Sequence, residues 1–221
     1  MFEVRAYPDD VVAAWQGSLL DGGPDVRTGR LGRFVQRVPL SRGAWLDLRP
    51  RWVDGADTLF ERLLDVVPWR AERRPMYDRV VDVPRLLCFY DEDEPLPDPA
   101  LNEAKRALDS HYAQELGEPF RTAGLCLYRD GRDSVAWHGD YVARRMNEAI
   151  VATISVGGAR RFLLRPKGGG RSISFDLGHG DLLVMGGTCQ RTWQHAIPKV
   201  AHADPRIAIM FRPAWKKEHG S

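Results

Sequence analysis

Three side chains in the second half of the sequence, those of His138, Asp140 and His195, have the types and order of a metal site. His138 and Asp140 are separated by Gly139, so in an extended segment both side chains point to the same face. His195 follows after several segments that we predict as strands. Two imidazoles and one carboxylate on one side of a metal are the ligand set of non-haem Fe(II), with positions left open. We therefore predict a catalytic iron site formed by these three residues.

The His-x-Asp pattern alone carries little information, because the sequence contains it three times, beginning at His138, His179 and His202. The triplet at His179 lies in a predicted turn just before an apolar run, and the triplet at His202 lies in a predicted loop before Pro205. Only the triplet at His138 follows a strand and loop and leaves room for hairpins before a later histidine. We expect the other two to be turn or surface residues.

Two arginines near the C-terminal end, Arg206 and Arg212, lie in a run that alternates like a strand. The alternation puts both arginines on one face and the apolar Ile207, Ile209 and Phe211 on the other. Arginines on an inward face need anions, because unpaired buried charge is costly. A dicarboxylate such as 2-oxoglutarate would supply two, each bound through paired hydrogen bonds. The alternative is an exposed edge strand with solvated arginines.

Two segments are rich in arginine, one between Arg70 and Arg85 and one around the glycine turn at 168–170. Each is either a solvated surface or a surface that neutralises nucleic-acid phosphates. In the first segment, Tyr77 or Met76 could wedge into a base stack. We expect the first segment to begin as a basic loop. The candidate nucleic-acid contacts are Met76, Tyr77, Arg79, Arg85, Arg160 and Arg161.

The elements that must position these side chains are two helices and a series of short strands. Apolar spacing predicts a helix from Ala56 to Val67, and Asp98 followed by Pro99 predicts the start of another that ends at Gly117. We predict strands at 83–90, 124–128, 149–156, 161–165, 172–177, 181–185 and 206–212. Short strands at this spacing indicate a mainly β fold with flanking helices (α+β), a two-sheet jelly roll in which the helices cover one sheet.

Length and composition set further limits. The chain has 221 residues, with 43% hydrophobic and 28% charged residues, as in an ordinary globular protein. The net charge of +2 is too small to identify a partner. The three cysteines are far apart and form no C-x-x-C pair, which indicates a reduced, cytoplasmic setting. The apolar runs are too short for a transmembrane helix, and residues after Met1 do not resemble a secretory signal, so we expect neither.

In this order, the motifs resemble those of the AlkB-type Fe(II)/2-oxoglutarate-dependent dioxygenases, which oxidatively dealkylate nucleic-acid bases. The resemblance extends from Met76 to Pro213 and rests on Val83-Pro84-Arg85, Tyr128-Arg129-Asp130-Gly131, His138-Gly139-Asp140, His179-Gly180-Asp181-Leu182-Leu183, Trp193-Gln194-His195 with Pro198 behind it, and 206–212.

The resemblance implies a double-stranded β-helix (jelly-roll) core at 121–221, preceded at 1–120 by an extension with covering helices and a nucleotide-recognition lid, in one structural domain overall. It implies that Fe(II) is bound by His138, Asp140 and His195. It also implies that 2-oxoglutarate is bound by Tyr128, Arg206 and Arg212, with Arg206 and Tyr128 at the distal carboxylate and Arg212 near the proximal one and near Asp140. Tyr77 matches an intercalating finger of some duplex-repairing members.

The activity implied is oxidative demethylation of bases of the 1-methyladenine or 3-methylcytosine type in DNA or RNA, as in DNA repair. Separately, we expect the protein to be a monomer. It consumes O2 and 2-oxoglutarate and releases formaldehyde, succinate and CO2. Two alternatives stay open: a hydroxylase of a small molecule or protein with the same chemistry, and a non-catalytic nucleic-acid-binding module.

The sequence departs from the family pattern at four positions. Cys126 stands where many members have asparagine, and Ala208 and Met210 stand where they often have asparagine and threonine. Val142 stands where well-known repair members have a carboxylate that helps to read the lesion. No clear match to the aromatic segment that stacks on a flipped base follows Tyr90. These departures concern the substrate and neutral hydrogen bonds to the co-substrate rather than the iron ligands.

Overall fold

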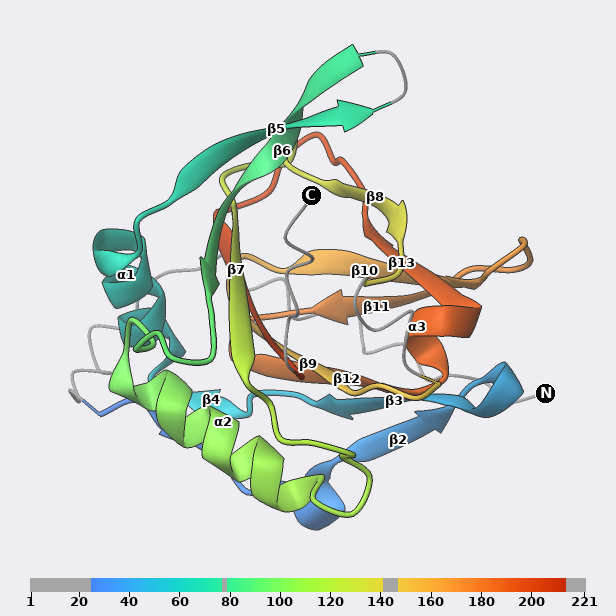
Figure 1. Cartoon of the computed structure of the whole chain (residues 1–221). Coiled ribbons are helices and arrows are strands. Elements are labelled where there is room, and N and C mark those ends of the chain that lie inside the picture. Colours follow the sequence, from blue (N-terminus) through green and yellow to red (C-terminus); the bar gives the residue numbers. More distant parts are fainter. Residues whose placement is uncertain (1–24, 77–78, 141–146, 214–221) are drawn as a thin grey trace.

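The computed structural model describes residues 25–76, 79–140 and 147–213. Three sheets, three α-helices and two short 3-10 helices make up this part of the chain (Figure 1). The elements are, in order, β1 (Arg27–Thr28), η1 (Gly32–Phe34), β2 (Gln36–Pro39), η2 (Ser41–Gly43), β3 (Ala44–Arg49), β4 (Val53–Asp54), α1 (Ala56–Val66), β5 (Arg70–Met76), β6 (Arg79–Tyr90), α2 (Pro99–His111), β7 (Thr122–Tyr128), β8 (Val135–His138), β9 (Val151–Gly157), β10 (Arg160–Pro166), β11 (Ile173–Leu177), β12 (Asp181–Gly187), α3 (Cys189–Thr192), β13 (Trp193–Ile197) and β14 (Arg206–Arg212).

The main sheet has eight antiparallel strands in the order β2-β3-β12-β9-β14-β7-β6-β5. A second sheet has four, in the order β11-β10-β13-β8, and β1 pairs with β4 in a small third sheet. The two larger sheets face each other and enclose the interior (Figure 1). The predicted two-sheet jelly roll is confirmed.

Alternation along each strand of the main sheet produces two separate apolar cores. On β14, Ile207, Ile209 and Phe211 belong to the core beneath α1 and α2, whereas Ala208 belongs to the core between the two sheets. The helices therefore cover the outer face of the main sheet, as predicted (Figure 1). Arg206 and Arg212 have the same parity as Ala208, so β14 carries them on its inner face.

Helix α2 begins as the sequence predicts and ends earlier. Oδ1 of Asp98 accepts a hydrogen bond from the backbone N–H of Ala100 at 2.8 Å, which is an N-cap with Pro99 in the first turn. The helix ends at His111 rather than near Gly117. Tyr112 leaves the helical conformation, and its buried hydroxyl group donates a hydrogen bond to Asp47 on β3 at 3.0 Å. A contact between residues so far apart in sequence leaves no local pattern.

The arginine-rich segment after Trp69 was expected to be a loop, and this prediction is wrong. It forms β5, which pairs with β6 in an antiparallel hairpin at the edge of the main sheet. Arg73 and Asp82 form an exposed ion pair across the hairpin, with 3.1 Å between Nε and Oδ1. Charged side chains are a usual feature of edge strands. Such a strand therefore lacks the apolar alternation by which a half-buried strand is predicted from sequence.

The division at residue 120 remains a prediction about sequence regions. In space, β2, β3, β5 and β6 from the first region and β7, β9, β12 and β14 from the second share the main sheet. In the described ranges, no helix has the length and apolar character needed to cross a membrane.

Candidate metal centre and co-substrate pocket

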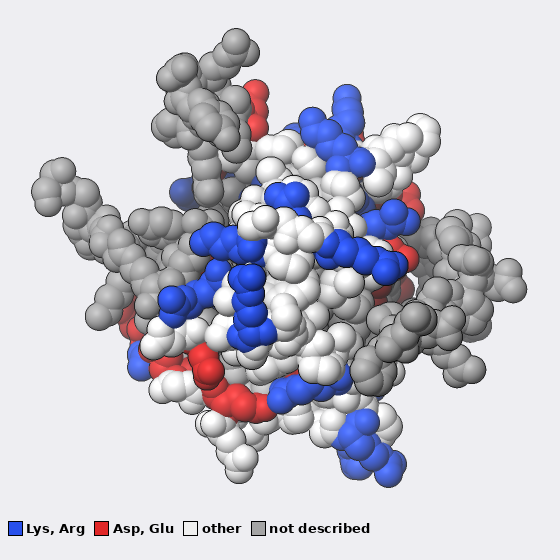
Figure 2. Space-filling model, turned by 90° about the vertical axis from the view of Figure 1, so that its right-hand side faces the viewer, with Lys and Arg blue, Asp and Glu red and all other residues white. Residues whose placement is uncertain are grey.

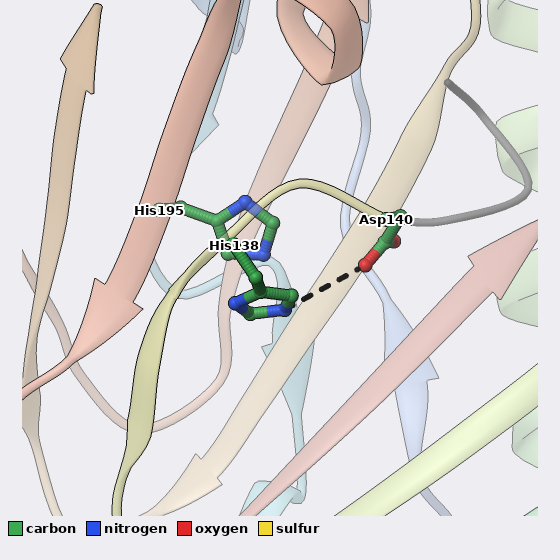
Figure 3. A group of neighbouring side chains, drawn as sticks. All are labelled: His138, Asp140 and His195. Atoms are coloured by element: carbon green, nitrogen blue, oxygen red, sulfur yellow. Dashed lines mark ion pairs between the residues drawn. The ribbon is translucent and has the colours of Figure 1, made fainter. Parts of the chain in front are cut away.

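His138, Asp140 and His195 meet between the two sheets. His138 ends β8 and lies opposite His195 in the pairing of β8 with β13, and their ring centroids are 4.2 Å apart. Asp140 follows two residues later, and its Oδ1 lies 3.8 Å from Nε2 of His138. One ligand atom from each of the three residues lies within 4.8 Å of the others (Figure 3). Antiparallel pairing of β8 with β13 thus brings together residues that the sequence separates.

Neighbouring groups fix the orientation of the three side chains. The carbonyl of Ala136 lies 2.9 Å from Nδ1 of His138 and can only accept, so Nδ1 carries the proton and Nε2 keeps its lone pair. The ring of Phe162 is stacked on His195, with centroids 5.4 Å apart. The N–H of Asp140 donates to Oε1 of Gln190 at 2.9 Å. A β-carbon on Gly139 would lie 2.7 Å from the carbonyl oxygen of Gln190, so the site needs glycine here.

Burial sets the protonation states of the two histidines, and a neighbouring charge sets that of Asp140. Burial, with the nearby His138, lowers the pKa of His195 to about 3, and burial also lowers the pKa of His138. Burial opposes ionisation of Asp140, but the charge of Arg212 outweighs it and holds the pKa of this carboxyl group below its ordinary value. At neutral pH the cluster therefore has two neutral imidazoles and one carboxylate. These are the states in which such groups bind a metal ion.

Arg206 lies deep in the same interior, with 1% of its surface exposed. Its Nε donates to Oγ of Ser155 at 2.8 Å, and its guanidinium carbon lies 5.3 Å from the ring centre of Tyr128, its register partner on β7. Nη1 is buried and has no hydrogen-bond partner among the described residues. Burial raises the pKa of Tyr128 to about 12, so its hydroxyl group keeps its proton and can donate. This end of the interior offers a charged donor and a neutral donor to an anion.

Arg212 lies at the other end of β14, beside the metal cluster. Its Nε donates to Oδ2 of Asp140 at 2.8 Å, and its Nη2 lies 3.4 Å from the sulfur of Met210. Only 10% of the Arg212 side chain is exposed. Both arginines thus face the interior, as the alternation predicts.

The sequence model of the 2OG-Fe(II) oxygenase superfamily matches residues 90–212, which is more than half of the chain. The chain belongs to this superfamily.

Curated relatives place it among the AlkB-type dioxygenases. It is 31% identical over 193 residues to alpha-ketoglutarate-dependent dioxygenase alkB homolog 3 of Homo sapiens, covering 79% of this chain and 68% of that protein. It is 26% identical over 245 residues to DNA oxidative demethylase ALKBH2 of Arabidopsis thaliana, covering 91% of this chain and 73% of that protein. The solved structure of OsALKBH1 shares the fold, with a TM-score of 0.54, 15% identity and coverage of 80% of this chain and 99% of that one.

Enzymes of this superfamily require Fe(II), 2-oxoglutarate and O2. The site fits both bound groups. The His-Asp-His cluster has the ligand types and protonation states for Fe(II), and the buried Nη1 of Arg206 lacks an acceptor that a carboxylate would supply.

The structure corrects the expected role of Arg160 in this AlkB-type dioxygenase. Its side chain, expected to contact nucleic acid, is only 2% exposed. Its guanidinium group donates to the backbone carbonyls of Asp130 (3.1 Å), Asp133 (2.8 Å) and Pro198 (2.7 Å) and so joins the loop between β7 and β8 to the loop after β13. Its neighbour Arg161 is 63% exposed and lies 3.9 Å from Asp176 in a weak ion pair.

Arg85, also expected to contact nucleic acid, is turned inward. Its Nη1 donates to the carbonyl of Ser134 at 3.1 Å, and its Nε is buried. Its positive charge also lowers the pKa of both His138 and His195, although burial and nearer groups have larger effects. Tyr77 lies outside the described residues, as do Val142 and the side chains of Met76 and Arg79.

The other two His-x-Asp triplets lie away from the metal cluster, as predicted. His179 accepts a hydrogen bond from the N–H of Gly157 at 2.8 Å and lies 3.1 Å from Asp57 of α1, so it holds a turn against a helix. Both carboxylate oxygens of Asp181 accept backbone N–H groups, at 2.7 and 2.8 Å. His202 is exposed in a loop.

Two residues beside the site were not identified from the sequence, Ser155 and Gln190. Ser155 is fully buried on β9, where Thr153 is a second buried polar residue, and polar residues at inward positions of a buried strand were a usable signal. Gln190 lies in the single-turn helix α3, for which the sequence carries no readable pattern.

Proposed function

We propose that this dioxygenase oxidatively demethylates N-alkylated bases of the 1-methyladenine or 3-methylcytosine type in DNA or RNA, with release of formaldehyde, succinate and CO2. The observation that carries the proposal is the His-Asp-His cluster beside two inward arginines, in a chain 31% identical to an alkB homolog. We further propose that it acts as a monomer in the cytoplasm, and the three free, buried cysteines are consistent with a reduced setting.

In this proposal His138, Asp140 and His195 bind Fe(II). Bound Fe(II), with 2-oxoglutarate as the electron donor, would supply the activation of O2 that hydroxylates a C–H bond. The chain's own contribution is to hold two neutral imidazoles and a carboxylate in place before the metal arrives. Ala136 sets the tautomer of His138, Phe162 fixes the ring of His195, and Arg212 keeps Asp140 ionised.

Arg206 and Tyr128 would bind one carboxylate of 2-oxoglutarate, and Arg212 would lie beside the other. The support is the orphaned Nη1 of Arg206, which is held in position by Ser155 and faces Tyr128. Charge-assisted bonds from a guanidinium are stronger than neutral ones, so the site can bind a dicarboxylate although Ala208 and Met210 supply no amide or hydroxyl group. Arg212 would also couple the co-substrate to Asp140 through the contact of its Nε.

A base inside a duplex cannot reach a buried metal, so the substrate would be single-stranded or flipped out, and lesions that impair pairing flip more easily. Figure 2 shows the side of the molecule where α3 and the β10–β11 turn lie, and lysine and arginine predominate on it. Lys167, Arg171 and Arg191 are exposed on these elements. Such a surface would neutralise the phosphates of the strand that carries the base.

In the test, purified protein is incubated with Fe(II), 2-oxoglutarate, O2 and an oligonucleotide. The oligonucleotides are single- or double-stranded and carry 1-methyladenine, 3-methylcytosine or ethenoadenine. The base mass and released formaldehyde are measured. We expect loss of the methyl group from 1-methyladenine, 3-methylcytosine or both, with one formaldehyde released per methylated base restored. Turnover of 2-oxoglutarate with every base unchanged would contradict the proposal and favour a hydroxylase of small molecules or proteins. Salt-dependent oligonucleotide binding without any turnover would favour a non-catalytic module.

A further inference from the structure

The segment from Arg27 to Arg51 concentrates the positive charge of the chain. It contains seven arginines and one acidic residue, Asp47, which gives it a net charge of +6 in a chain whose total is +2. Asp47 is only 2% exposed and accepts hydrogen bonds from Arg37 and Tyr112, so it neutralises no other arginine at the surface. The function proposed for the metal centre uses none of these arginines.

Most of these arginines are exposed, and only some of them are paired. Arg27 forms an ion pair with Asp25 at 2.9 Å, and Arg37 forms one with Asp47 at 2.8 Å. In the described ranges, no ion pair joins a carboxylate to the remaining exposed arginines, which are Arg30, Arg33, Arg42 and Arg51. Like charges that are gathered on one surface repel each other, and a bound polyanion would relieve this repulsion.

Aromatic rings hold three of the guanidinium groups in place. The guanidinium carbons of Arg33 and Arg49 lie 5.2 and 5.4 Å from the ring centre of Phe34, which is 44% exposed. The guanidinium carbon of Arg37 lies 3.9 Å from the ring centre of Trp45. A guanidinium group over a ring uses its face for this contact, and its N–H donors lie in its plane. Charged donors are therefore held at the surface in positions where phosphate oxygens can accept from them.

This arginine surface lies on the outer face of the main sheet, away from the metal cluster. On β3, Ala44 and Leu46 belong to the core between the two sheets. Alternation therefore directs Trp45 and Arg49 to the opposite face, at the edge where β2 pairs with β3.

Arg42 connects the arginine surface to the side of the molecule near the metal centre. It lies on η2, between β2 and β3, and its carbonyl accepts a hydrogen bond from the hydroxyl group of Thr188 at 2.6 Å. Thr188 directly precedes α3, which contacts the N–H of Asp140 through Gln190 and carries the exposed Arg191. Basic residues therefore continue from the side shown in Figure 2 around the β2–β3 edge.

We propose that Arg30, Arg33 and Arg49, gathered around Phe34, form a second nucleic-acid-binding surface that holds phosphates of the strand outside the metal centre. The choice of nucleic acid as the polyanion rests on the proposed function. A strand that leaves the metal centre along α3 and η2 would reach this surface. An anionic membrane is the other polyanion to consider, but binding to it also needs a row of apolar side chains. Among the described residues of this segment, Phe34 is the one exposed large apolar residue.

The experiment measures binding of an unmodified single-stranded oligonucleotide of about 20 nucleotides by fluorescence anisotropy over a range of salt concentrations. Arg33→Gln should reduce the slope of log affinity against log salt by about 0.7, as expected for one lost phosphate contact, and should weaken binding at low salt at least about threefold. Phe34→Ala keeps the net charge but releases the guanidinium groups, so it should weaken binding by about two- to fivefold.

Arg132→Gln is the matched control. Arg132 has an 87% exposed side chain and pairs with Asp130 at 2.7 Å, in the loop between β7 and β8. The variant also removes one exposed positive charge, but far from η1 in the fold, and it should keep the wild-type salt slope and an affinity within about twofold of the wild type.

A wild-type salt slope in Arg33→Gln would overturn the proposal, and so would a wild-type affinity in Phe34→Ala. An effect of equal size in Arg132→Gln would also overturn it, because net charge rather than a built surface would then explain the binding. Vesicles of phosphatidylcholine and phosphatidylserine test the membrane. If Arg33→Gln loses binding to these vesicles but binds the oligonucleotide like the wild type, the surface belongs to a membrane contact instead. Failure of the proposed function gives a different result, in which the wild type leaves all modified bases intact while Arg33→Gln still binds the unmodified strand more weakly.

Discussion

Nε of Arg212 lies 2.8 Å from Oδ2 of Asp140, and only 10% and 7% of the two side chains are exposed. This contact connects β14 to the end of the β8 segment and joins the co-substrate side of the interior to the metal cluster. Removing one partner of a buried ion pair leaves an uncompensated charge. The contact therefore accounts for the ionised state of Asp140 in a buried place, and it makes Arg212 a positioning residue for the metal site.

Arg212→Gln should weaken Fe(II) binding by about 10- to 100-fold, as is common when a partner of a metal ligand is lost. Without the guanidinium charge, the pKa of Asp140 rises, and the carboxylate loses its fixed orientation. Anaerobic titration of metal-free protein with Fe(II) measures the dissociation constant. Arg161→Gln, which changes an exposed arginine on β10, is the control and should bind Fe(II) like the wild type. Equal affinities in all three proteins would show that Arg212 does not support the metal site.

Arg206→Lys should raise KM for 2-oxoglutarate by about tenfold or more, while kcat changes less. Lysine keeps the charge but cannot offer two parallel N–H groups, and it loses the contact of Nε with Ser155. Steady-state turnover of 2-oxoglutarate at saturating Fe(II) measures both constants. An unchanged KM would mean that the orphaned Nη1 is not the carboxylate-binding group.

Arg160→Gln should lower the free energy of unfolding by about 2–4 kcal/mol, because three backbone carbonyls, one of them in a buried hydrogen bond, lose a charged donor. Arg161→Gln should change this free energy by less than about 0.5 kcal/mol, since its ion pair is exposed, but it should weaken oligonucleotide binding at low salt. Denaturant unfolding and anisotropy titrations measure the two effects. The reverse pattern would restore Arg160 as a nucleic-acid contact.

The metal-free protein should lose stability as the pH falls from about 6.5 towards 5. Unfolded histidine has a pKa of about 6.5. Burial first, then the neighbouring histidine, lowers the pKa of His195 to about 3 in the folded chain. In this window the unfolded state therefore binds more protons, and stability falls on acidification by at most about 1.4 kcal/mol per pH unit for this group. The shift of His138 acts in the same direction.

Urea unfolding of metal-free wild type and His195→Gln between pH 7 and 5 tests this expectation. The window stays above the range in which Asp140 titrates. The variant should show a shallower dependence of the free energy of unfolding on pH. Identical slopes in the two proteins would contradict the assignment of the effect to His195.

The sequence was sufficient to predict an element or a site where the local periodicity agrees with the long-range pairing of strands. Alternation on β14 correctly put Arg206 and Arg212 on one face, and Asp98 with Pro99 correctly gave the start of α2. The meeting of His138 and His195 was predicted from the strands expected between them, which allow the chain to return. In the structure, β13 pairs with β8 and places the two histidines opposite each other.

The remaining features depend on contacts that no local pattern carries. The end of α2 is set by Tyr112 reaching Asp47, and β5 is a strand because β6 pairs with it. Arg160 is different, because its burial was within reach of the sequence. It has the same parity as the buried Phe162 and Leu164, whereas Arg161 has the parity of the outward-facing residues of β10. The positive charge of Arg160 led to the expectation of an exposed side chain, although the alternation of β10 indicates an inward position.

Conversion of 2-oxoglutarate to succinate by purified protein tests the central claim most directly, with Fe(II) and O2 present and with wild type, His138→Ala and His202→Ala compared. Both variants remove a histidine that begins a His-x-Asp triplet, but only His138 lies in the metal cluster. We expect Fe(II)-dependent turnover in the wild type, the same turnover in His202→Ala and none above background in His138→Ala. Wild-type turnover in His138→Ala would show that this cluster is not the iron site.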